Sequence, residues 1–322
     1  MTALKKRVLG RTGFEVTELG FGAWPIGGEA YGPVSENNAI ETIETYVSAG
    51  GNLIDTAPVY ANSETYIGKA LKGKGIREKI FIATKTMKGD TIETIPDIKQ
   101  EIDNSLRALQ TDYVDIYFLH KPPDEPDVMN RAIDEFEKLK NQGKIRAIGA
   151  SVKLANVTPE TVRLCRQYID TGRVDVLEVA YSILRQANAE NFAYAHEKGV
   201  GIIVRTAIES GFLTGRYKPG DVFTEGHRKR WSEQTLQEIL KHASELQTYA
   251  IRRPYRSLAQ VALRFALVPK EVSCVIVGAE NPEEVLKNIE TLSLPPLEED
   301  LLERLRREFE GKTQLFNLNP PK

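Results

Sequence analysis

Four polar residues that could do acid–base chemistry, Asp55, Tyr60, Lys85 and His120, occur in the first part of the chain. Asp55, Lys85 and His120 each lie at the end of a short apolar run, and Tyr60 is in the loop that follows Asp55. Singly, each has an ordinary structural interpretation, such as a turn cap, a packed aromatic, a solvated lysine or a satisfied histidine. Their occurrence in three consecutive strand–helix units favours one shared site.

These residue types fit a proton transfer to or from a carbonyl oxygen. A tyrosine hydroxyl titrates near 10, so action near neutrality requires a shift of about three units, or about 4 kcal/mol in favour of the phenolate. The ammonium group of Lys85 could supply much of that stabilisation, and Asp55 would keep the lysine charged. His120 could orient and polarise the carbonyl oxygen as a fixed donor. We therefore expect Tyr60 to be the general acid/base.

Eight short apolar runs rich in β-branched residues predict the strands that position these side chains. Their nearly continuous hydrophobicity is typical of parallel strands that are covered on both faces. Amphipathic segments with recognisable helix starts lie between them, for example at Ser35 and at Thr158-Pro159. The expected strands are Glu18–Gly22, Asn52–Thr56, Ile80–Lys85, Val114–His120, Ile145–Ser151, Val174–Tyr181, Gly201–Ala207 and Val272–Gly278.

This alternation predicts an α/β fold, a closed (β/α)8 TIM barrel, with residues 1–322 as a single domain. An open doubly wound sheet is the alternative, and it is less favoured because no G-x-G-x-x-G follows the first strand. Residues 7–16 predict an N-terminal β-hairpin at the bottom of the barrel. Residues 214–231 are expected to form a cofactor or substrate flap, since long loops in compact domains tend to be functional. Residues 313–322 are expected to form a surface tail.

The composition fits a cytoplasmic globular protein. Of 322 residues, 41% are hydrophobic and the net charge is −2, with acids and bases balanced along the chain, so no nucleic-acid partner is expected. No apolar run could span a bilayer and the N-terminus lacks the apolar core of a signal peptide, so no membrane association is expected. Cys165 and Cys274 provide no disulfide framework, and the four histidines form no metal-binding motif.

Motifs along almost the whole chain resemble, in order, those of the aldo-keto reductases. The resemblance implies a (β/α)8 barrel with a nicotinamide cofactor over its mouth, and hydride transfer between nicotinamide C4 and a carbonyl carbon. It also implies that Tyr60 is the acid/base, that Asp55 and Lys85 tune it, and that His120 orients the substrate. The matching motifs are Leu19–Gly22, Gly51–Ala57, Ile67–Leu71, Ala83–Lys85, Asp112–His120, Gly143–Gly149, Gly211–Gly215 and Ile276–Ala279.

The same resemblance implies a set of cofactor contacts, with two departures at the nicotinamide carboxamide. Val152 stands where the family usually has asparagine, and Glu178 stands where it usually has glutamine; an ionised Glu178 could only accept hydrogen bonds. Arg205 replaces a stacking aromatic, although an arginine plane can also stack. The expected contacts are Gly22, Ala23, Trp24, Ser151 (carboxamide), Glu178, Arg205, Thr206, Gly211, Leu213 and Gly215 (pyrophosphate loop), Gly278, Glu280, Glu284 and Asn288 (adenine).

The residues after the last expected strand favour NADH among the NAD(P)H cofactors. Relatives that use the phosphorylated cofactor usually have Lys or Arg here, whereas this chain has Glu280, with Glu284 beyond it. A carboxylate would repel a 2′-phosphate and could accept a hydrogen bond from a ribose 2′-hydroxyl. Two alternatives stay open. Glu280 could have a merely structural role as the cap of the helix that begins at Pro282, and Arg216 of the flap could still bind the phosphate.

The expected substrate is a small carbonyl compound or alcohol in contact with Trp24, Tyr60, His120 and Trp231, although Trp231 could equally anchor the flap. The run His227–Arg230 could favour an anionic or polyhydroxylated substrate, or it could simply be solvated. A Schiff-base lyase that uses the lysine at the third strand is one alternative function. A redox-sensing regulatory subunit of the same fold is another. Family precedent implies a monomer.

Overall fold

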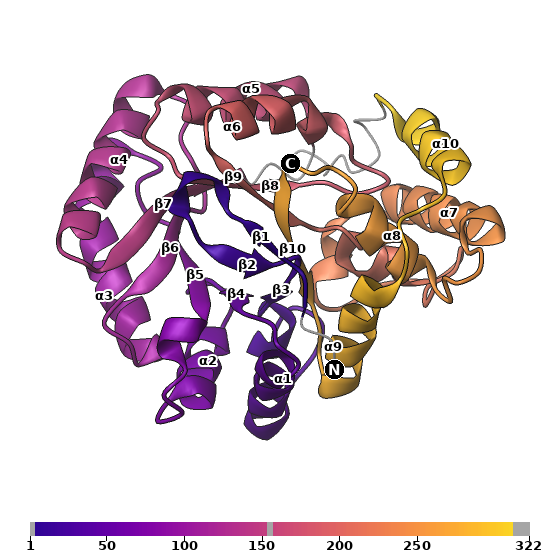
Figure 1. Cartoon of the computed structure of the whole chain (residues 1–322), viewed down its shortest axis with the longest axis horizontal. Helices are drawn as coiled ribbons and strands as arrows, with labels where there is room; N and C mark the ends of the chain where they lie inside the picture. The colour runs from indigo at the N-terminus through magenta and orange to yellow at the C-terminus, as the bar shows by residue number, and fades with distance from the viewer. Residues whose placement is uncertain (1–3, 153–156, 312–322) are drawn as a thin grey trace.

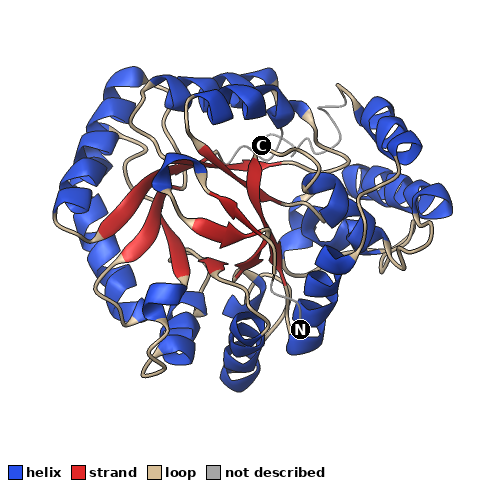
Figure 2. Ribbon diagram, viewed as in Figure 1, coloured by secondary structure: helices blue, strands red, loops and turns tan. Residues whose placement is uncertain are grey.

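The computed structural model describes residues 4–152 and 157–311, and the expected tail at 313–322 lies outside them. Eight parallel strands close into a barrel, so the predicted (β/α)8 fold is confirmed. Figure 2 shows the strands at the centre and the helices around them. In barrel order the strands are β10 Val272–Gly278, β3 Leu19–Gly22, β4 Leu53–Asp55, β5 Phe81–Thr86, β6 Val114–Leu119, β7 Ile145–Ser151, β8 Val176–Ala180 and β9 Gly201–Arg205.

Several helices begin where their cap residues predict. The side chains of Ser35, Thr158 and Asn281 each accept a hydrogen bond from the backbone N–H three residues later, which satisfies an N–H group at the helix start. The α-helices are α1 Glu36–Ser48, α2 Ser63–Leu71, α3 Ile98–Leu109, α4 Pro126–Asn141, α5 Pro159–Asp170, α6 Phe192–Glu197, α7 Glu233–Ala250, α8 Leu258–Ala266, α9 Pro282–Glu290 and α10 Glu299–Phe309.

A two-stranded antiparallel hairpin, β1 Lys6–Val8 with β2 Glu15–Thr17, precedes the barrel and crosses its N-terminal end (Figure 1). Leu9, Phe14 and Val16 from this segment belong to the apolar cluster inside the barrel. The backbone N–H of Arg11 also donates to the carbonyl of Gly199, in the loop before β9. The predicted hairpin is therefore confirmed, and it closes the bottom of the barrel.

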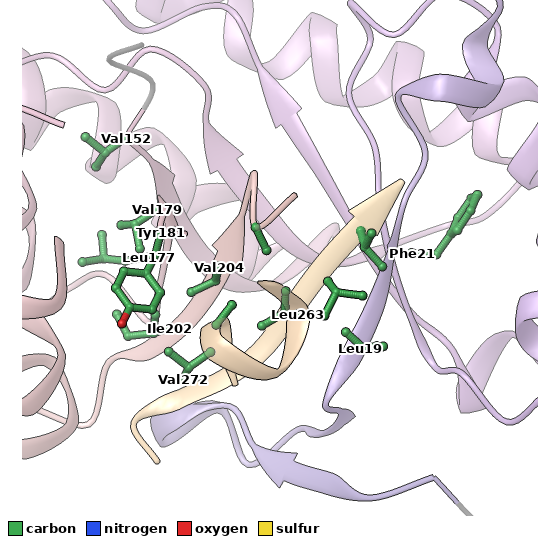
Figure 3. Packing of buried hydrophobic residues seen from close by; sticks show 14 of the residues in the cluster. Leu19, Phe21, Val152, Leu177, Val179, Tyr181, Ile202, Val204, Leu263 and Val272 are labelled. Carbon is green, nitrogen blue, oxygen red and sulfur yellow. The ribbon is translucent and has the colours of Figure 1, made fainter. Parts of the chain in front are cut away.

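The core has two layers, because strands that are covered on both faces send alternate side chains inward and outward. The outer layer packs the strands against the helices, and Figure 3 shows part of it, including Leu19 and Phe21 of β3, Val204 of β9 and Leu263 of α8. The strand residues of the inner layer are Leu53, Phe81, Ala83, Ile116, Phe118, Ala147, Val176, Ile203, Cys274 and Ile276.

Two helices of the C-terminal third lie outside the simple strand–helix alternation. α7 and α8 both lie between β9 and β10, and α10 follows α9 (Figure 1). The hydroxyl of Tyr249 in α7 donates to Glu308 in α10 at 2.6 Å, which ties these two helices together. In the described ranges, no helix combines the length and the apolarity that a membrane crossing requires.

Candidate active site

The strand register gathers polar side chains at the carboxyl rim of the barrel. Asp55 ends β4 opposite Gly22, and Lys85 lies near the end of β5. Ser151 ends β7 and is directly opposite Glu178 of β8. Because all eight strands are parallel, these ends meet at one edge, which is where active sites of this fold lie.

Lys85 is the centre of the buried polar cluster at this edge. Its ammonium group is fully buried and donates to Asp55 Oδ1 at 2.6 Å and to the Thr56 carbonyl at 3.0 Å. It also lies 3.4 Å from Oε2 of Glu178 and 5.2 Å from the ring centroid of Tyr60. The predicted association of Asp55, Tyr60 and Lys85 is therefore present in the structure.

Tyr60 is enclosed by two other predicted residues. Its ring centroid lies 6.0 Å from that of His120, with the planes nearly perpendicular, and 5.8 Å from the ring of Trp24. His120 follows β6 directly, and its backbone N–H donates to the Thr86 carbonyl at 2.9 Å, which continues the ladder to β5. A carbonyl group above Tyr60 would thus lie between an imidazole and an aromatic wall.

Glu178, one of the predicted cofactor contacts, extends the cluster toward β9, and its ionic contacts with Lys85 and Arg205 were not predicted from the sequence. Its Oε1 accepts from the Ser151 hydroxyl at 2.8 Å and lies 3.5 Å from Nε of Arg205. The Arg205 guanidinium also donates to the Val152 carbonyl at 2.8 Å. Positive and negative groups therefore alternate from Asp55 through Lys85 and Glu178 to Arg205, a compensated arrangement that buried charges require.

The electrostatics of the cluster keep Lys85 charged and Tyr60 neutral. Burial opposes the charge on Lys85, but Asp55 and Glu178 outweigh it and raise its pKa above the ordinary value. Burial likewise raises the pKa of Tyr60 well above 10, while Lys85 acts in the opposite direction. Lys85 does lower the pKa of Tyr60, as we expected, but burial raises this pKa by more.

The two buried carboxyl groups differ. Burial and the neighbouring Glu178 raise the pKa of Asp55, and Lys85 opposes them. Burial acts in the same direction on Glu178, but Lys85 and Arg205 together lower its pKa below the ordinary value. Glu178 is therefore the more firmly ionised of the two.

A cavity of about 840 Å³ opens above this cluster, and most of the predicted site residues line it. A volume of this size is typical of cofactor and small-molecule sites. The predicted residues on its wall are Gly22, Trp24, Asp55, Tyr60, His120, Glu178, Arg205, Thr206, Gly211, Gly278, Glu280, Glu284 and Asn288.

The remaining predicted cofactor and catalytic residues are not among those that line the cavity. Lys85 and Ser151 reach it through the ion pair and the hydrogen bond described above. Ala23 and Leu213 are completely buried in the outer core layer. Gly215 ends a short 3-10 helix with a φ of 82°, a conformation that glycine adopts without strain.

The segment after β9 holds an unusual run of left-handed backbone. Thr206, Glu209 and Ser210 have φ values of 67°, 49° and 55°, in a region that residues with side chains rarely occupy. Glu209 is held by a buried ion pair with Arg185, whose Nε lies 2.9 Å from Glu209 Oε1. Sequence reasoning missed this pair, because no local pattern connects the two positions.

The expected flap lies against the first loop of the barrel. The backbone N–H of His227 donates to the carbonyl of Ala30 at 2.7 Å, and the His227 ring lies 4.0 Å from that of Trp24. Trp231 is only 5% exposed and packs edge-on against Phe212. Of the two roles open for Trp231, its position fits the flap anchor, since it is not part of the cavity wall.

The two acidic residues predicted to contact the cofactor after β10, Glu280 and Glu284, have different surroundings. Asn281, not Glu280, caps α9, and the Glu284 carboxylate accepts from the Glu280 backbone N–H at 2.9 Å. The Glu280 side chain faces the cavity, where burial and Glu284 raise its pKa while Arg216 and Arg228 lower it. The simple capping role considered for Glu280 is therefore filled by its neighbour.

Comparisons with known proteins agree with this geometry. Residues 18–307 match the model of the aldo/keto reductase family. The chain is 30% identical to L-galactose dehydrogenase of Arabidopsis thaliana, over 90% of this chain and 88% of that protein. It is also 30% identical to an NADH-specific methylglyoxal reductase of Escherichia coli, over 90% and 94%. An aldo-keto reductase from Bacillus halodurans, solved in its holo form, superposes with a TM-score of 0.75 at 27% identity, over 99% and 98% of the two chains.

Proposed function

Because the chain belongs to the aldo/keto reductase family and is an NAD(P)-dependent oxidoreductase, we propose that Tyr60 exchanges the proton of its carbonyl/alcohol pair. The observation that carries this proposal is the position of the Tyr60 ring, 5.2 Å from the buried Lys85 ammonium and 6.0 Å from His120. When bound, a nicotinamide cofactor would supply or take up the hydride. All other steps fall to residues of the chain.

In the direction of reduction, Tyr60 acts as the general acid. Its raised pKa keeps the hydroxyl protonated at neutral pH, so a proton is available to the oxygen of the reacting carbonyl. The charge that forms on the phenolate is stabilised by Lys85, which the buried carboxyls hold in its ionised form. His120 orients and polarises the carbonyl as a fixed dipole.

The cavity wall fits a nicotinamide dinucleotide. Ser151 and Glu178 would hold the carboxamide, with Glu178 as an acceptor for its NH2 group, and Arg205 would lie against the ring. The loop around Gly211 would hold the pyrophosphate, and Asn288 the adenine. In this arrangement residues 214–231 form a flap over the cofactor.

We favour NADH over NADPH. The Glu280 carboxylate faces the cavity without a capping role, so it can accept from a ribose 2′-hydroxyl and would repel a 2′-phosphate. The Escherichia coli relative described as NADH-specific supports this choice. Arg216 and Arg228 near Glu280 are the groups that would act against it.

The alternative Schiff-base chemistry is disfavoured by the state of Lys85. An amine must be neutral to attack a carbonyl, whereas Lys85 is fully buried and ion-paired with Asp55. A redox-sensing regulatory subunit would not need to turn over repeatedly. The presence of the whole set of acid–base residues therefore favours an enzyme over such a subunit.

The proposal is tested by following the oxidation of NADH in the presence of small aldehydes such as methylglyoxal. Repeated turnover that stops when Tyr60 is replaced by Phe would support it. Reduction by borohydride that traps the aldehyde covalently on Lys85 would favour the lyase instead. A single turnover without a steady state would favour the redox sensor.

A further inference from the structure

The basic run His227–Arg230 is not a uniformly solvated surface. It forms a short 3-10 helix, and its residues His227, Arg228 and Arg230 line the cavity. Lys229 and Arg230 are both exposed to solvent, but Lys229 is not on the cavity wall. The two arginines thus bring positive charge to the site that contains Tyr60.

Arg228 is held by other parts of the protein. Its Nε donates to the Ser210 carbonyl at 3.0 Å, and its guanidinium lies 4.5 Å from the ring centroid of Tyr31 and 4.7 Å from that of Tyr217. Glu280 interacts electrostatically with Arg228 and Arg216. Arg228 therefore belongs to the half of the cavity where Glu280 lies.

Arg230 interacts with Tyr31, as Arg228 does, and also with arginines near the cluster around Lys85. Its charge interacts with Arg185 and Arg205, and the Arg205 side chain in turn reaches Glu178 above Lys85. Arg230 stacks 4.2 Å from the ring centroid of Trp231, the flap anchor, which fixes the direction of its side chain.

Of Arg185, Arg205 and Arg230, Arg230 is the one that forms no ion pair with an acid among the described residues. Arg185 is paired with Glu209, and Arg205 lies 3.5 Å from Glu178, but across residues 4–152 and 157–311 Arg230 forms no hydrogen bond and no ion pair. Burial and the positive charge of Arg185 lower the pKa of Arg230 to about 10, so the group stays charged at neutral pH. A cationic fork directed at a cavity is the preferred partner of a carboxylate or a phosphate.

An aromatic wall connects this charge with the reacting centre. The ring of His227 lies 4.0 Å from that of Trp24, and Trp24 lies 5.8 Å from Tyr60. If the carbonyl of a substrate lies at Tyr60 and the rest of the molecule follows this wall, an anionic group at its other end would lie near the flap.

We propose that Arg230 binds an anionic group of the substrate, so that the enzyme prefers carbonyl compounds that carry a carboxylate or a phosphate. This inference rests on the oxidoreductase function proposed above and adds a substrate class to it.

The test compares anionic with neutral aldehydes of similar reactivity. 4-Formylbenzoate is paired with its methyl ester, and glyceraldehyde 3-phosphate with glyceraldehyde, so that carboxylate and phosphate are distinguished. The variants are Arg230→Met and, as a matched control, Lys229→Met, which removes an equal charge outside the cavity wall. The dissociation constant of NADH is measured for each by fluorescence titration.

We expect that, in at least one of the two pairs, the wild type has a higher kcat/KM for the anionic aldehyde than for its neutral counterpart. Arg230→Met should lower kcat/KM for that member by about 10- to 100-fold, the usual effect of losing a charge-assisted hydrogen bond, and should change the neutral member by less than about 2-fold. Lys229→Met should leave both values and the affinity for NADH unchanged.

Equal effects of Arg230→Met on both members, or no preference in the wild type, would overturn the inference and leave the proposed function intact. Weaker NADH binding by Arg230→Met would also overturn it, because Arg230 would then hold the cofactor. If no aldehyde is turned over, the proposed function fails. Calorimetric binding of 4-(hydroxymethyl)benzoate and of its methyl ester to the NADH complex would then decide separately whether Arg230 selects the anion.

Discussion

The ammonium group of Lys85 lies 3.4 Å from the Glu178 carboxylate, in addition to its ion pair with Asp55. Lys85 is therefore balanced by two buried carboxyl groups instead of one. Because Glu178 also raises the pKa of Tyr60, the second carboxyl acts on the proposed acid/base as well as on the lysine. The family resemblance predicted glutamine here, so this balance is a feature of this chain.

Replacing Glu178 by Gln should move the pH dependence of alcohol oxidation to lower pH. Without the negative charge, the influence of Lys85 on Tyr60 grows and the phenolate forms more easily. The measurement is the pH profile of kcat in the oxidation direction. Ser151→Ala is the control, because it removes the hydrogen bond to Glu178 but keeps the charge, and it should shift the profile less. An unchanged profile in Glu178→Gln would contradict the prediction.

Replacing Lys85 by Met should lower the free energy of unfolding by about 3–5 kcal/mol, because it leaves buried Asp55 without its cation and Glu178 with Arg205 alone. Urea denaturation of the wild type and the variant measures the difference. Adding Asp55→Asn to the Lys85→Met variant should recover part of the loss. If the single variant is as stable as the wild type, the positive charge of Lys85 does not stabilise the cluster.

The rate of carbonyl reduction should not fall through ionisation of Tyr60 below a pH of about 9, because its pKa is raised above the ordinary value of 10. Burial is the main cause, so the phenol stays protonated and the acid form dominates. The pH profile of kcat with saturating NADH measures this, with Tyr60→Phe as the baseline. A basic limb near neutrality would mean that Lys85 outweighs burial.

Replacing Glu280 by Arg should tighten NADPH binding by about 10-fold or more, since one charge that repels the 2′-phosphate becomes one that attracts it. Fluorescence titration with NADH and NADPH measures both affinities. Glu283→Arg introduces the same change at an exposed position of α9 beside the cavity and serves as the control. If the wild type already binds NADPH more tightly than NADH, the role given to Glu280 is wrong.

The barrel could be predicted because each strand carries its own signal. Runs such as Ile145–Ser151 are buried on both faces except at Arg146, and caps such as Asn281 mark helix starts within a few residues. Asp55 and Lys85 were predictable for the same reason, since strand ends of a parallel barrel meet at one edge.

Other parts of the site depend on contacts between distant segments and have no local signal. The ion pair of Arg185 with Glu209 joins the loop after β8 to the left-handed turn after β9. The sequence of neither segment indicates that the two are in contact. The run His227–Arg230 did have a local signal, but which of its residues reach the cavity wall could not be predicted, because that depends on how Trp231 packs on Phe212. The effect of burial on Tyr60 could not be judged before its surroundings were known.

The most direct test of the central claim is transfer of deuterium to an aldehyde from NADH that carries deuterium at both C4 positions of the nicotinamide, followed by mass spectrometry of the alcohol. In the wild type we predict deuterium on the former carbonyl carbon over many turnovers. Tyr60→Phe should lose the reaction by at least about 100-fold while it keeps its affinity for NADH. Product without deuterium, or a Tyr60→Phe variant as active as the wild type, would contradict the assignment of Tyr60 as the acid/base of a hydride-transfer site.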